Sequence, residues 1–308
     1  MRNKITIIGA GNVGATTALY CAIKELGDIV LIDIIEGMPE GIALDMSQVS
    51  SMLNFDVKIT GSNDMCDMKG SDIVVITAGL PRKPGMDRLD LLKKNADIVT
   101  NICENIKKYA PNSIVIVVTN PVDTLTYLTM KLTELPAKHV IGKAGVLDSA
   151  RFAYFIAEEL NISIRDVSPM VLGGHGDSML PIPRLTTVNG IPITDLLPKD
   201  KITAICERTK AGGAEIVKLL KKGSAYYAPG AATATMITAI LFDQRRILPC
   251  SVYVDGQYGL SDLYIGLMTT VGMKGVEKIH EIKLTDEELK ELHQSAEVYK
   301  KSIKDLGY

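Results

Sequence analysis

The chain has few of the features that mark secreted, membrane-spanning or nucleic-acid-binding proteins. Its five cysteines lie far apart and form no C-x-x-C pair, which argues against a disulfide scaffold or a zinc site. Its formal net charge is only −2, so the whole chain has no strong attraction to nucleic acid or to an anionic membrane. No apolar run approaches the roughly 18 residues of a membrane helix. The apolar run at residues 5–8 is too short for a signal-peptide core. We expect a cytoplasmic protein with no metal site and no nucleic-acid or membrane partner.

Three common catalytic signatures are also missing. The sequence contains no G-x-S-x-G of serine hydrolases, no H-E-x-x-H of zinc proteases and no G-x-x-x-x-G-K-[ST] of phosphate-binding loops. The 308 residues exceed a typical single domain, and 46% of them are hydrophobic, so the chain can bury a sizeable core. We therefore expect two domains and a chemistry outside these three classes.

The first 33 residues are the most informative stretch. An apolar run at 5–8 precedes the sequence GAGNVG at 9–14, an alanine-rich segment continues to residue 26, and a second apolar run ends in Asp33. Short runs of β-branched residues are typical of buried parallel strands, and the glycines predict a tight turn. The stretch therefore predicts a strand, a turn, a helix over 15–26 and a second strand.

The spacing of the three glycines has a mechanical reason. Gly9 permits the turn, Gly11 lets a pyrophosphate approach the backbone, and Gly14 lets the helix pack closely on the strand. Asp33 lies 19 positions after Gly14, near the spacing of about 20 expected for an acid that binds the adenosine ribose. Its charge would repel a 2′-phosphate, which favours NAD over NADP. The alternative is that Asp33 is merely a solvated acid at a strand end.

The pattern of elements predicts an α/β fold. Further buried strands are expected at 55–60, 73–77, 113–118 and 139–142, with helices at 37–51 and 90–109. These elements predict a Rossmann-type doubly wound parallel sheet in residues 1–143.

The pattern changes after residue 143. The sequence there predicts helices at 148–160, 199–222, 227–241 and 285–306, strands at 167–172, 247–254 and 263–268, and a hairpin at Asn189-Gly190. Residues 144–308 are therefore expected to form a mixed α+β, mainly antiparallel, substrate domain.

A charged loop follows the predicted strand 73–77. Residues 80–89 read LPRKPGMDRL, with Arg82, Lys83 and Arg88 among prolines and a glycine. In open α/β sheets the ligand crevice lies beyond the carboxyl ends of the strands, so these cations are placed to meet a substrate. A solvated loop is the alternative, and we favour solvation for Lys83. Asn120, which precedes Pro121 at the end of the strand 113–118, is predicted to point into the same crevice.

Among the four histidines, His175 has the most unusual surroundings. It lies between glycines in GGHGD, so a substrate and a cofactor ring have room to approach the imidazole. Imidazole can give or take a proton near neutral pH, as hydride transfer to a ketone requires. A carboxylate on its other nitrogen would fix the tautomer, and Asp148 and Asp177 are both candidates. The other three histidines have no supporting motif and are interpreted as structural or surface residues.

Six motifs taken in order resemble the lactate/malate dehydrogenase family over essentially the whole chain. They are GAGNVG, LIDI, AGLPRKPGMDR, VTNPVD, GVLDSAR and LGGHGD. The similarity is greatest to the lactate-dehydrogenase-like malate dehydrogenases. It implies an NAD-dependent oxidoreductase of the tricarboxylic acid cycle, which transfers a hydride reversibly between (S)-malate and oxaloacetate.

The resemblance also implies roles for the candidate residues. His175 would handle the proton, Asp148 rather than Asp177 would orient it, and Arg151 would bind the C1 carboxylate of the substrate. The loop would close and bring Arg88 to polarise the carbonyl, while Asn120 would hold the substrate oxygen. The residues expected to bind NAD are Gly9, Ala10, Gly11, Asn12, Val13, Gly14, Asp33, Asn95, Val118, Thr119 and Asn120.

The substrate is expected to depend on Arg82. Lactate-using relatives typically carry glutamine at this position, whereas malate-using relatives carry arginine. A second carboxylate needs a cation in a closed pocket, while the methyl group of pyruvate would leave that cation buried and unpaired, at a cost of about 3–5 kcal/mol. The resemblance therefore favours a dicarboxylate substrate.

Two alternatives remain at this point. A lactate dehydrogenase would perform the same chemistry on a monocarboxylate, and Arg82 argues against it. A catalytically silent NAD-binding module would not need His175, Asp148, Arg151 and Arg88 together. Members of the family are usually dimers or tetramers, so a homodimer or homotetramer is expected. The alanine-rich segment 231–234 would suit either a subunit interface or a buried core.

Overall fold

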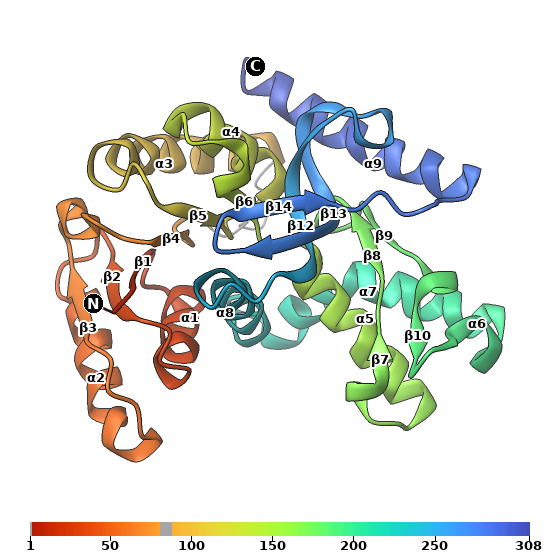
Figure 1. The fold of residues 1–308 in the computed structure, drawn as a ribbon, viewed down its shortest axis with the longest axis horizontal. Coiled ribbons are helices and arrows are strands. Elements are labelled where there is room, and N and C mark those ends of the chain that lie inside the picture. The colour runs from red at the N-terminus through yellow and green to blue at the C-terminus, as the bar shows by residue number, and fades with distance from the viewer. Residues whose placement is uncertain (1, 81–87) are drawn as a thin grey trace.

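The N-terminal half is built on a parallel sheet with helices on both faces (Figure 1). The computed structural model describes residues 2–80 and 88–308. The six strands lie in the order β3-β2-β1-β4-β5-β6. Their bounds are β1 Lys4–Ile8, β2 Asp28–Ile32, β3 Ile59–Ser62, β4 Ile73–Ile76, β5 Ile114–Val117 and β6 Val140–Gly142. The helices are α1 Asn12–Ile23, α2 Met38–Leu53, α3 Arg88–Tyr109 and α4 Val122–Thr133. The predicted Rossmann-type sheet is confirmed.

Burial on both faces explains why the strands are continuous apolar runs. In β4, Ile73 and Val75 belong to the core on one face of the sheet, and Val74 and Ile76 belong to the core on the other. Since successive side chains point to opposite faces, a strand covered on both sides must be apolar at every position.

The second half adds antiparallel strands to the edge of the same sheet. Its helices are α5 Gly145–Leu160, α6 Ile193–Leu196, α7 Lys199–Leu220, α8 Tyr227–Leu241 and α9 Asp286–Asp305. Its strands are β7 Val167–Ser168, β8 Val171–Gly173, β9 Met179–Pro181, β10 Thr187–Val188, β11 Ile191–Pro192, β12 Arg246–Asp255, β13 Ser261–Gly272 and β14 Gly275–Ile279. Strand β12 joins β6 through the pair Ser251 and Gly142, and the order continues as β13-β8-β9. The mixed, mainly antiparallel character of this half is confirmed.

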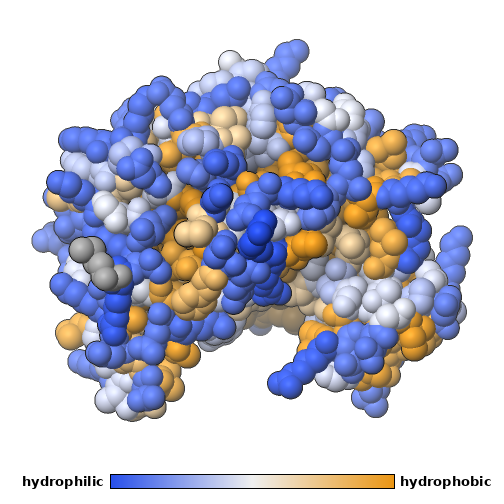
Figure 2. Space-filling view, in the orientation of Figure 1, coloured by the Kyte–Doolittle hydropathy of each residue, from blue (hydrophilic) through white to orange (hydrophobic). Residues whose placement is uncertain are grey.

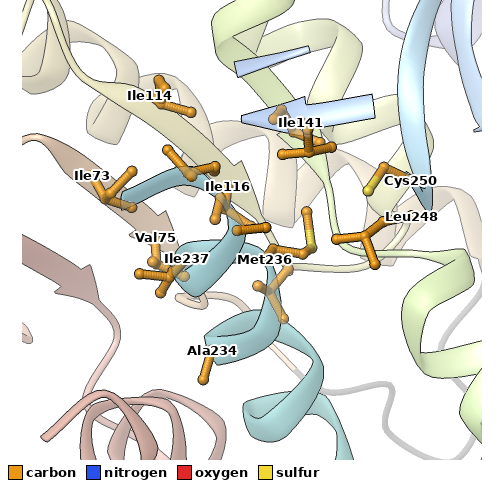
Figure 3. Close-up of a cluster of buried hydrophobic side chains, with 14 of the residues drawn as sticks. Ile73, Val75, Ile114, Ile116, Ile141, Ala234, Met236, Ile237, Leu248 and Cys250 are labelled. Atoms are coloured by element: carbon orange, nitrogen blue, oxygen red, sulfur yellow. The ribbon is translucent and has the colours of Figure 1, made fainter. Parts of the chain in front are cut away.

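Helix α8 belongs to the second half but packs against the first. Figure 3 shows Met236 and Ile237 of α8 beside Val75 and Ile116 of the parallel sheet. Helix α8 also contacts α1 so closely that a Cβ atom on Gly230 would lie 2.7 Å from Thr16. The segment 231–234, whose sequence suited either a core or an interface, is therefore largely buried inside this chain.

Several predicted boundaries were wrong. The expected strand at 167–172 is two strands, β7 and β8, because Pro169 lies between them and has no N–H for a strand ladder. The strand expected at 55–60 begins only at Ile59. Helices α1 and α5 each begin three residues before their predicted starts. The hairpin is confirmed: Asn189 and Gly190, both with positive φ, connect β10 to β11.

Two searches of the described ranges complete the picture of the fold. Among residues 2–80 and 88–308, no helix is long and apolar enough to span a membrane. Within these ranges we also find no group of three or more His, Cys, Asp or Glu side chains arranged to hold a metal ion.

Candidate active site

The glycine loop leads from β1 into α1 at the carboxyl edge of the sheet. Gly9 has a φ of +102°, and a Cβ atom there would lie 2.6 Å from the Ala78 nitrogen. A Cβ atom on Gly14 would lie 1.8 Å from the Gly9 carbonyl oxygen. In contrast, a Cβ atom on Gly11 would meet no atom of the described chain within 4 Å. The first and third glycines are therefore required by the fold, whereas Gly11 borders open space.

The start of α1 has unsatisfied backbone donors. Gly11 is the N-cap residue, and no side chain caps the helix there. The first N–H groups of a helix have no partner inside it, and the helix dipole makes that end attractive to anions. Asn12 and Val13 form the first turn. The loop therefore fits the pyrophosphate of a dinucleotide, with open space where that group would approach.

Asp33 follows β2 and is tied to this loop. Its Oδ2 accepts a hydrogen bond from the Ala10 N–H at 2.8 Å, and its Oδ1 accepts one from the Ile35 N–H at 3.1 Å. The side chain is half-buried, so its outer lone pairs remain accessible. A carboxylate held in this way can accept further hydrogen bonds from the hydroxyl groups of a ribose.

Asn95 joins the segments that follow β4 and β5. Its Oδ1 accepts from the Leu80 N–H at 2.8 Å, and its Nδ2 donates to the Asn120 carbonyl at 2.8 Å. The residue is 1% exposed, so its amide is committed to the backbone. The Thr119 hydroxyl similarly donates to the Ala78 carbonyl at 2.7 Å. The Asn120 side chain is exposed, and Val118 is buried. The side chains of Asn95 and Thr119 thus fix the crevice wall, and the Asn120 side chain is the one that faces outward.

His175 and Asp148 form a pair at the end of the sheet. His175 Nδ1 lies 2.8 Å from Asp148 Oδ2. Asp148, in the first turn of α5, is 1% exposed. Among the described residues nothing hydrogen-bonds to His175 Nε2, and 11% of the side-chain surface is exposed to solvent. Asp177, the other sequence candidate, is exposed. The imidazole therefore has a fixed orientation and a nitrogen open to a substrate.

Arg151 lies one turn after Asp148 on α5. Its Nη1 is 3.4 Å from Asp148 Oδ1, and its side chain is 14% exposed. Its Nε is buried and has no hydrogen-bond partner among the described residues. Burial lowers the pKa of the guanidinium, although arginine remains charged at any physiological pH. A buried guanidinium with an unmatched donor fits a carboxylate that approaches in a two-pronged contact.

The main chain of His175 is held from two sides. Its N–H donates to Asp123 Oδ2 at 2.9 Å, and its carbonyl accepts from the Tyr299 hydroxyl at 3.0 Å. Asp123 also accepts from the Ser251 hydroxyl at 2.6 Å. These residues lie on α4, α9 and β12. Burial raises the pKa of Asp123, and these hydrogen bonds oppose that shift. Together with α5, which carries Asp148, four separated segments therefore fix the position of one imidazole.

Some predicted residues lie outside the described part of the chain. Arg82 and Lys83 belong to residues 81–87, and the side chain of Arg88, at the first position of α3, is also not described. The described residues bring together His175, Asp148 and Arg151, with Asn95 and Asn120 on the neighbouring crevice wall. The glycine loop and Asp33 form a separate group at the β1 and β2 ends.

Sequence reasoning missed the residues that support the cluster. Asp123 lies in the VTNPVD motif, yet its partner is 52 residues away. Tyr299 lies 124 residues from His175, on a helix that the sequence predicts at 285–306 without any link to the site. The pattern of predicted elements changes near Lys143, but nothing in the local sequence indicates that this lysine is only 2% exposed. An acid at the start of an otherwise buried helix was the one available signal, and it pointed to Asp123.

Comparisons with known proteins agree with this geometry. Residues 3–142 match the lactate/malate dehydrogenase NAD binding domain, and residues 145–307 match the alpha/beta C-terminal domain of the same family. A malate dehydrogenase from a Roseiflexus species is 52% identical over 306 residues, 99% of each chain. The apo structure of malate dehydrogenase from Picrophilus torridus superposes with a TM-score of 0.97 at 46% identity, covering 99% of this chain and 97% of that one.

A solved lactate dehydrogenase is also similar. The enzyme from Cryptosporidium parvum, complexed with lactic acid and the dinucleotide, gives a TM-score of 0.97 at 40% identity and covers 100% of this chain and 98% of that one. The fold is thus common to enzymes of both names, while the sequence is more similar to the malate dehydrogenases. Because both of its halves match one family over nearly their whole length, the chain belongs to the lactate/malate dehydrogenase family.

Proposed function

We propose that the protein is an NAD-dependent malate dehydrogenase that interconverts (S)-malate and oxaloacetate. The observation that carries this proposal is the group formed by His175, Asp148 and Arg151: an imidazole with one nitrogen fixed and one open, beside a guanidinium with an unmatched donor. These are the groups needed to protonate a ketone oxygen that lies beside a carboxylate. The 52% identity to a malate dehydrogenase supports the choice of substrate.

The cofactor is NAD, in agreement with the family of the N-terminal domain. When bound, it supplies or accepts the hydride. We propose that residues 9–14 hold the pyrophosphate through the backbone and the start of α1, and that Asp33 accepts from the adenosine ribose. Asn95 and residues 118–120 would line the remainder of the cleft. For Asn95 this contribution is indirect, because its amide is already bonded to the backbone.

The proton is assigned to His175. In reduction of oxaloacetate, Nε2 would donate its proton to the oxygen that becomes the hydroxyl group, and in oxidation of malate the neutral imidazole would accept it. Asp148 lies 2.8 Å from Nδ1, where it would accept from Nδ1–H and so present Nε2 to the substrate. Burial of Asp148 strengthens this interaction because water does not screen it.

The substrate carboxylates are assigned to two arginines. Arg151 would bind the C1 carboxylate, which would satisfy its buried Nε. Asn120, whose side chain is exposed, would hold the substrate oxygen. Arg82 would bind the second carboxylate, and Arg88 would polarise the carbonyl. These last two assignments depend on the sequence motif, since their side chains lie outside the described residues.

The test is oxidation of NADH by the purified protein, followed at the absorbance of the reduced nicotinamide, with oxaloacetate and pyruvate side by side at neutral pH. We expect a strong preference for oxaloacetate. A preference for pyruvate would keep the proton relay but overturn the substrate. No NADH oxidation with either substrate, together with tight NADH binding, would indicate an NAD-binding module and contradict the proposal.

We also propose two domains, 1–143 and 144–308, and a homodimeric or homotetrameric assembly in the cytoplasm. The family matches end at 142 and begin at 145, which supports that boundary. Exposed apolar side chains support an assembly: Leu44, Met52 and Leu53 on α2 are 62%, 73% and 46% exposed. Figure 2 shows hydrophobic atoms at the surface at the lower left, where Figure 1 has α2. Sedimentation of the purified protein would test the assembly.

A further inference from the structure

Lys143 is a buried cation to which the described residues offer no partner. It is 2% exposed, and within residues 2–80 and 88–308 no hydrogen bond or ion pair reaches its ammonium group. Lysine is almost never fully buried unless it is paired, because the ammonium loses its hydration and keeps three donors unmatched. The missing acceptor is therefore expected to belong to a ligand.

The position of Lys143 indicates which part of the ligand this is. It follows β6, and its N–H donates to the Val117 carbonyl at the end of β5 at 2.8 Å. Strand β6 is separated from β2 by β1, β4 and β5. Asp33, at the end of β2, would hold the adenosine, so the other end of the dinucleotide must extend toward the ends of β5 and β6. Lys143 thus lies at the nicotinamide end of the cleft.

The charged groups around Lys143 are those of the proposed active site. Asp148 and Arg151 on α5 and Asp123 on α4 all act on its charge. Strand β5, Ile114–Val117, carries no ionisable side chain. On β12, the residue paired with Gly142 is Ser251, and burial raises the pKa of its neighbour Cys250 to about 12. His175 is linked to these charged groups by its contact with Asp148.

We propose that Lys143 contacts the nicotinamide end of the bound cofactor and makes the site favour NADH over NAD⁺. The inference rests on the proposed function, since it requires the dinucleotide to bind in that orientation. The oxidised ring carries a positive charge and the reduced ring carries none. A buried ammonium beside the ring therefore repels the oxidised form, while its donors can satisfy the carboxamide oxygen of either form.

The effect depends on pH in a defined direction. Burial, with a smaller contribution from Arg151, lowers the pKa of Lys143 to about 8, while Asp148 and Asp123 oppose the shift. Below this pKa the ammonium is charged and disfavours NAD⁺. As the pH rises through it, the charge is lost and the two forms should bind more equally.

The experiment measures the dissociation constants of NAD⁺ and NADH by titration calorimetry and nucleotide fluorescence, without substrate. In Lys143→Met the ratio of the NAD⁺ constant to the NADH constant should fall about five- to tenfold at neutral pH, which corresponds to one charge partly screened. The wild-type ratio should fall in the same direction between about pH 7 and pH 9, whereas the Lys143→Met ratio should stay flat.

Lys138→Met is the matched control. Lys138 is exposed and lies shortly before β6, so its replacement makes the same change in net charge away from the cleft, and the ratio should not change. If Lys143→Met does not fold, Lys143→Gln removes the charge while keeping a donor, and Lys143→Arg should retain the wild-type ratio. An unchanged ratio in folded Lys143→Met, with NADH still bound, would overturn this inference alone. Failure of the wild type to bind either nucleotide would overturn the proposed function as well.

Discussion

The proposed nucleotide edge and the proposed proton relay are built in opposite ways. The edge comes from one continuous stretch, residues 4–33, in which backbone groups and a single acid would bind the nucleotide. The relay comes from α4, α5, β12, α9 and the segment after β8, and its members range from Asp123 to Tyr299. The edge is open where Gly11 lies, whereas Asp123 and Asp148 are each 1% exposed.

This difference has a physical origin. A pyrophosphate is recognised by backbone N–H groups and a helix dipole, which one turn can supply. Proton transfer beside a carboxylate needs charged groups removed from water, and removing charges from water requires several packed elements. Each prediction below changes one region by substitution and asks whether the function proposed for the other region is unaffected.

Among the variants that keep His175, the largest effect is expected from Arg151→Gln. This change removes the cation proposed for the C1 carboxylate, and leaving that carboxylate unpaired in a buried site costs about 3–5 kcal/mol. The kcat/KM for oxaloacetate should therefore fall about 10²- to 10⁴-fold, while NADH binding stays near wild type. Steady-state kinetics and NADH fluorescence titration would measure both. Arg165→Gln, at an exposed arginine, is the control. Near-normal kcat/KM in Arg151→Gln would remove Arg151 from the site.

Arg82→Gln should alter the substrate preference and leave the rest of the relay intact. Without the second cation, the ratio of kcat/KM for oxaloacetate to that for pyruvate should fall by about 10²-fold or more. The measurement is the pair of efficiencies under one set of conditions. If the two efficiencies fall together, or if neither changes, Arg82 does not discriminate between the substrates.

Two glycine variants sharpen the account of the nucleotide edge. Gly14→Ala would force a Cβ atom toward the Gly9 carbonyl, so it should lower the free energy of unfolding by about 1–3 kcal/mol and weaken NADH binding by about tenfold. Gly11→Ala meets open space in the protein, so it should weaken NADH binding without loss of stability. Denaturant unfolding and NADH titration separate the two. Equal stability losses would contradict the different steric roles.

The smallest effect is expected from Tyr299→Phe. The change removes the hydroxyl group that donates to the His175 carbonyl, at a cost of about 1–3 kcal/mol if that carbonyl stays buried and unpaired. We expect kcat to fall a few-fold with little change in the KM for NADH, because the imidazole shifts while the nucleotide edge does not. Tyr154→Phe, at an exposed tyrosine of α5, controls for the loss of a hydroxyl. An unchanged kcat would mean that α9 does not position His175.

The contrast also explains what could be predicted from the sequence. Strands buried on both faces produce apolar runs, so β1, β4 and β5 were evident, and Asn189-Gly190 specified its hairpin. Strands β9 and β14 have three and five residues and little alternation, and they were missed. Pro169 was the local signal that should have divided the strand expected at 167–172.

The site divided in the same way. The steric roles of Gly9 and Gly14 followed from a local pattern and agree with the structure. The pairing of His175 with Asp148 rather than Asp177 did not, because spacing left both acids open and only the family resemblance separated them. His280 and His293, interpreted as structural or surface residues, bond to Thr270 Oγ1 and to the Tyr258 carbonyl, both at 2.7 Å. Contacts such as Tyr299 with His175 depend on the tertiary fold and have no local signature.

The most direct test of the account is His175→Asn, assayed for NADH binding and for turnover of oxaloacetate in the same preparation. Because the two regions are separate, we predict that the dissociation constant of NADH stays within about twofold of wild type. Loss of the proton donor should lower kcat by about 10²- to 10⁴-fold. Full turnover by the folded variant would contradict the central claim that His175, held by Asp148, handles the proton.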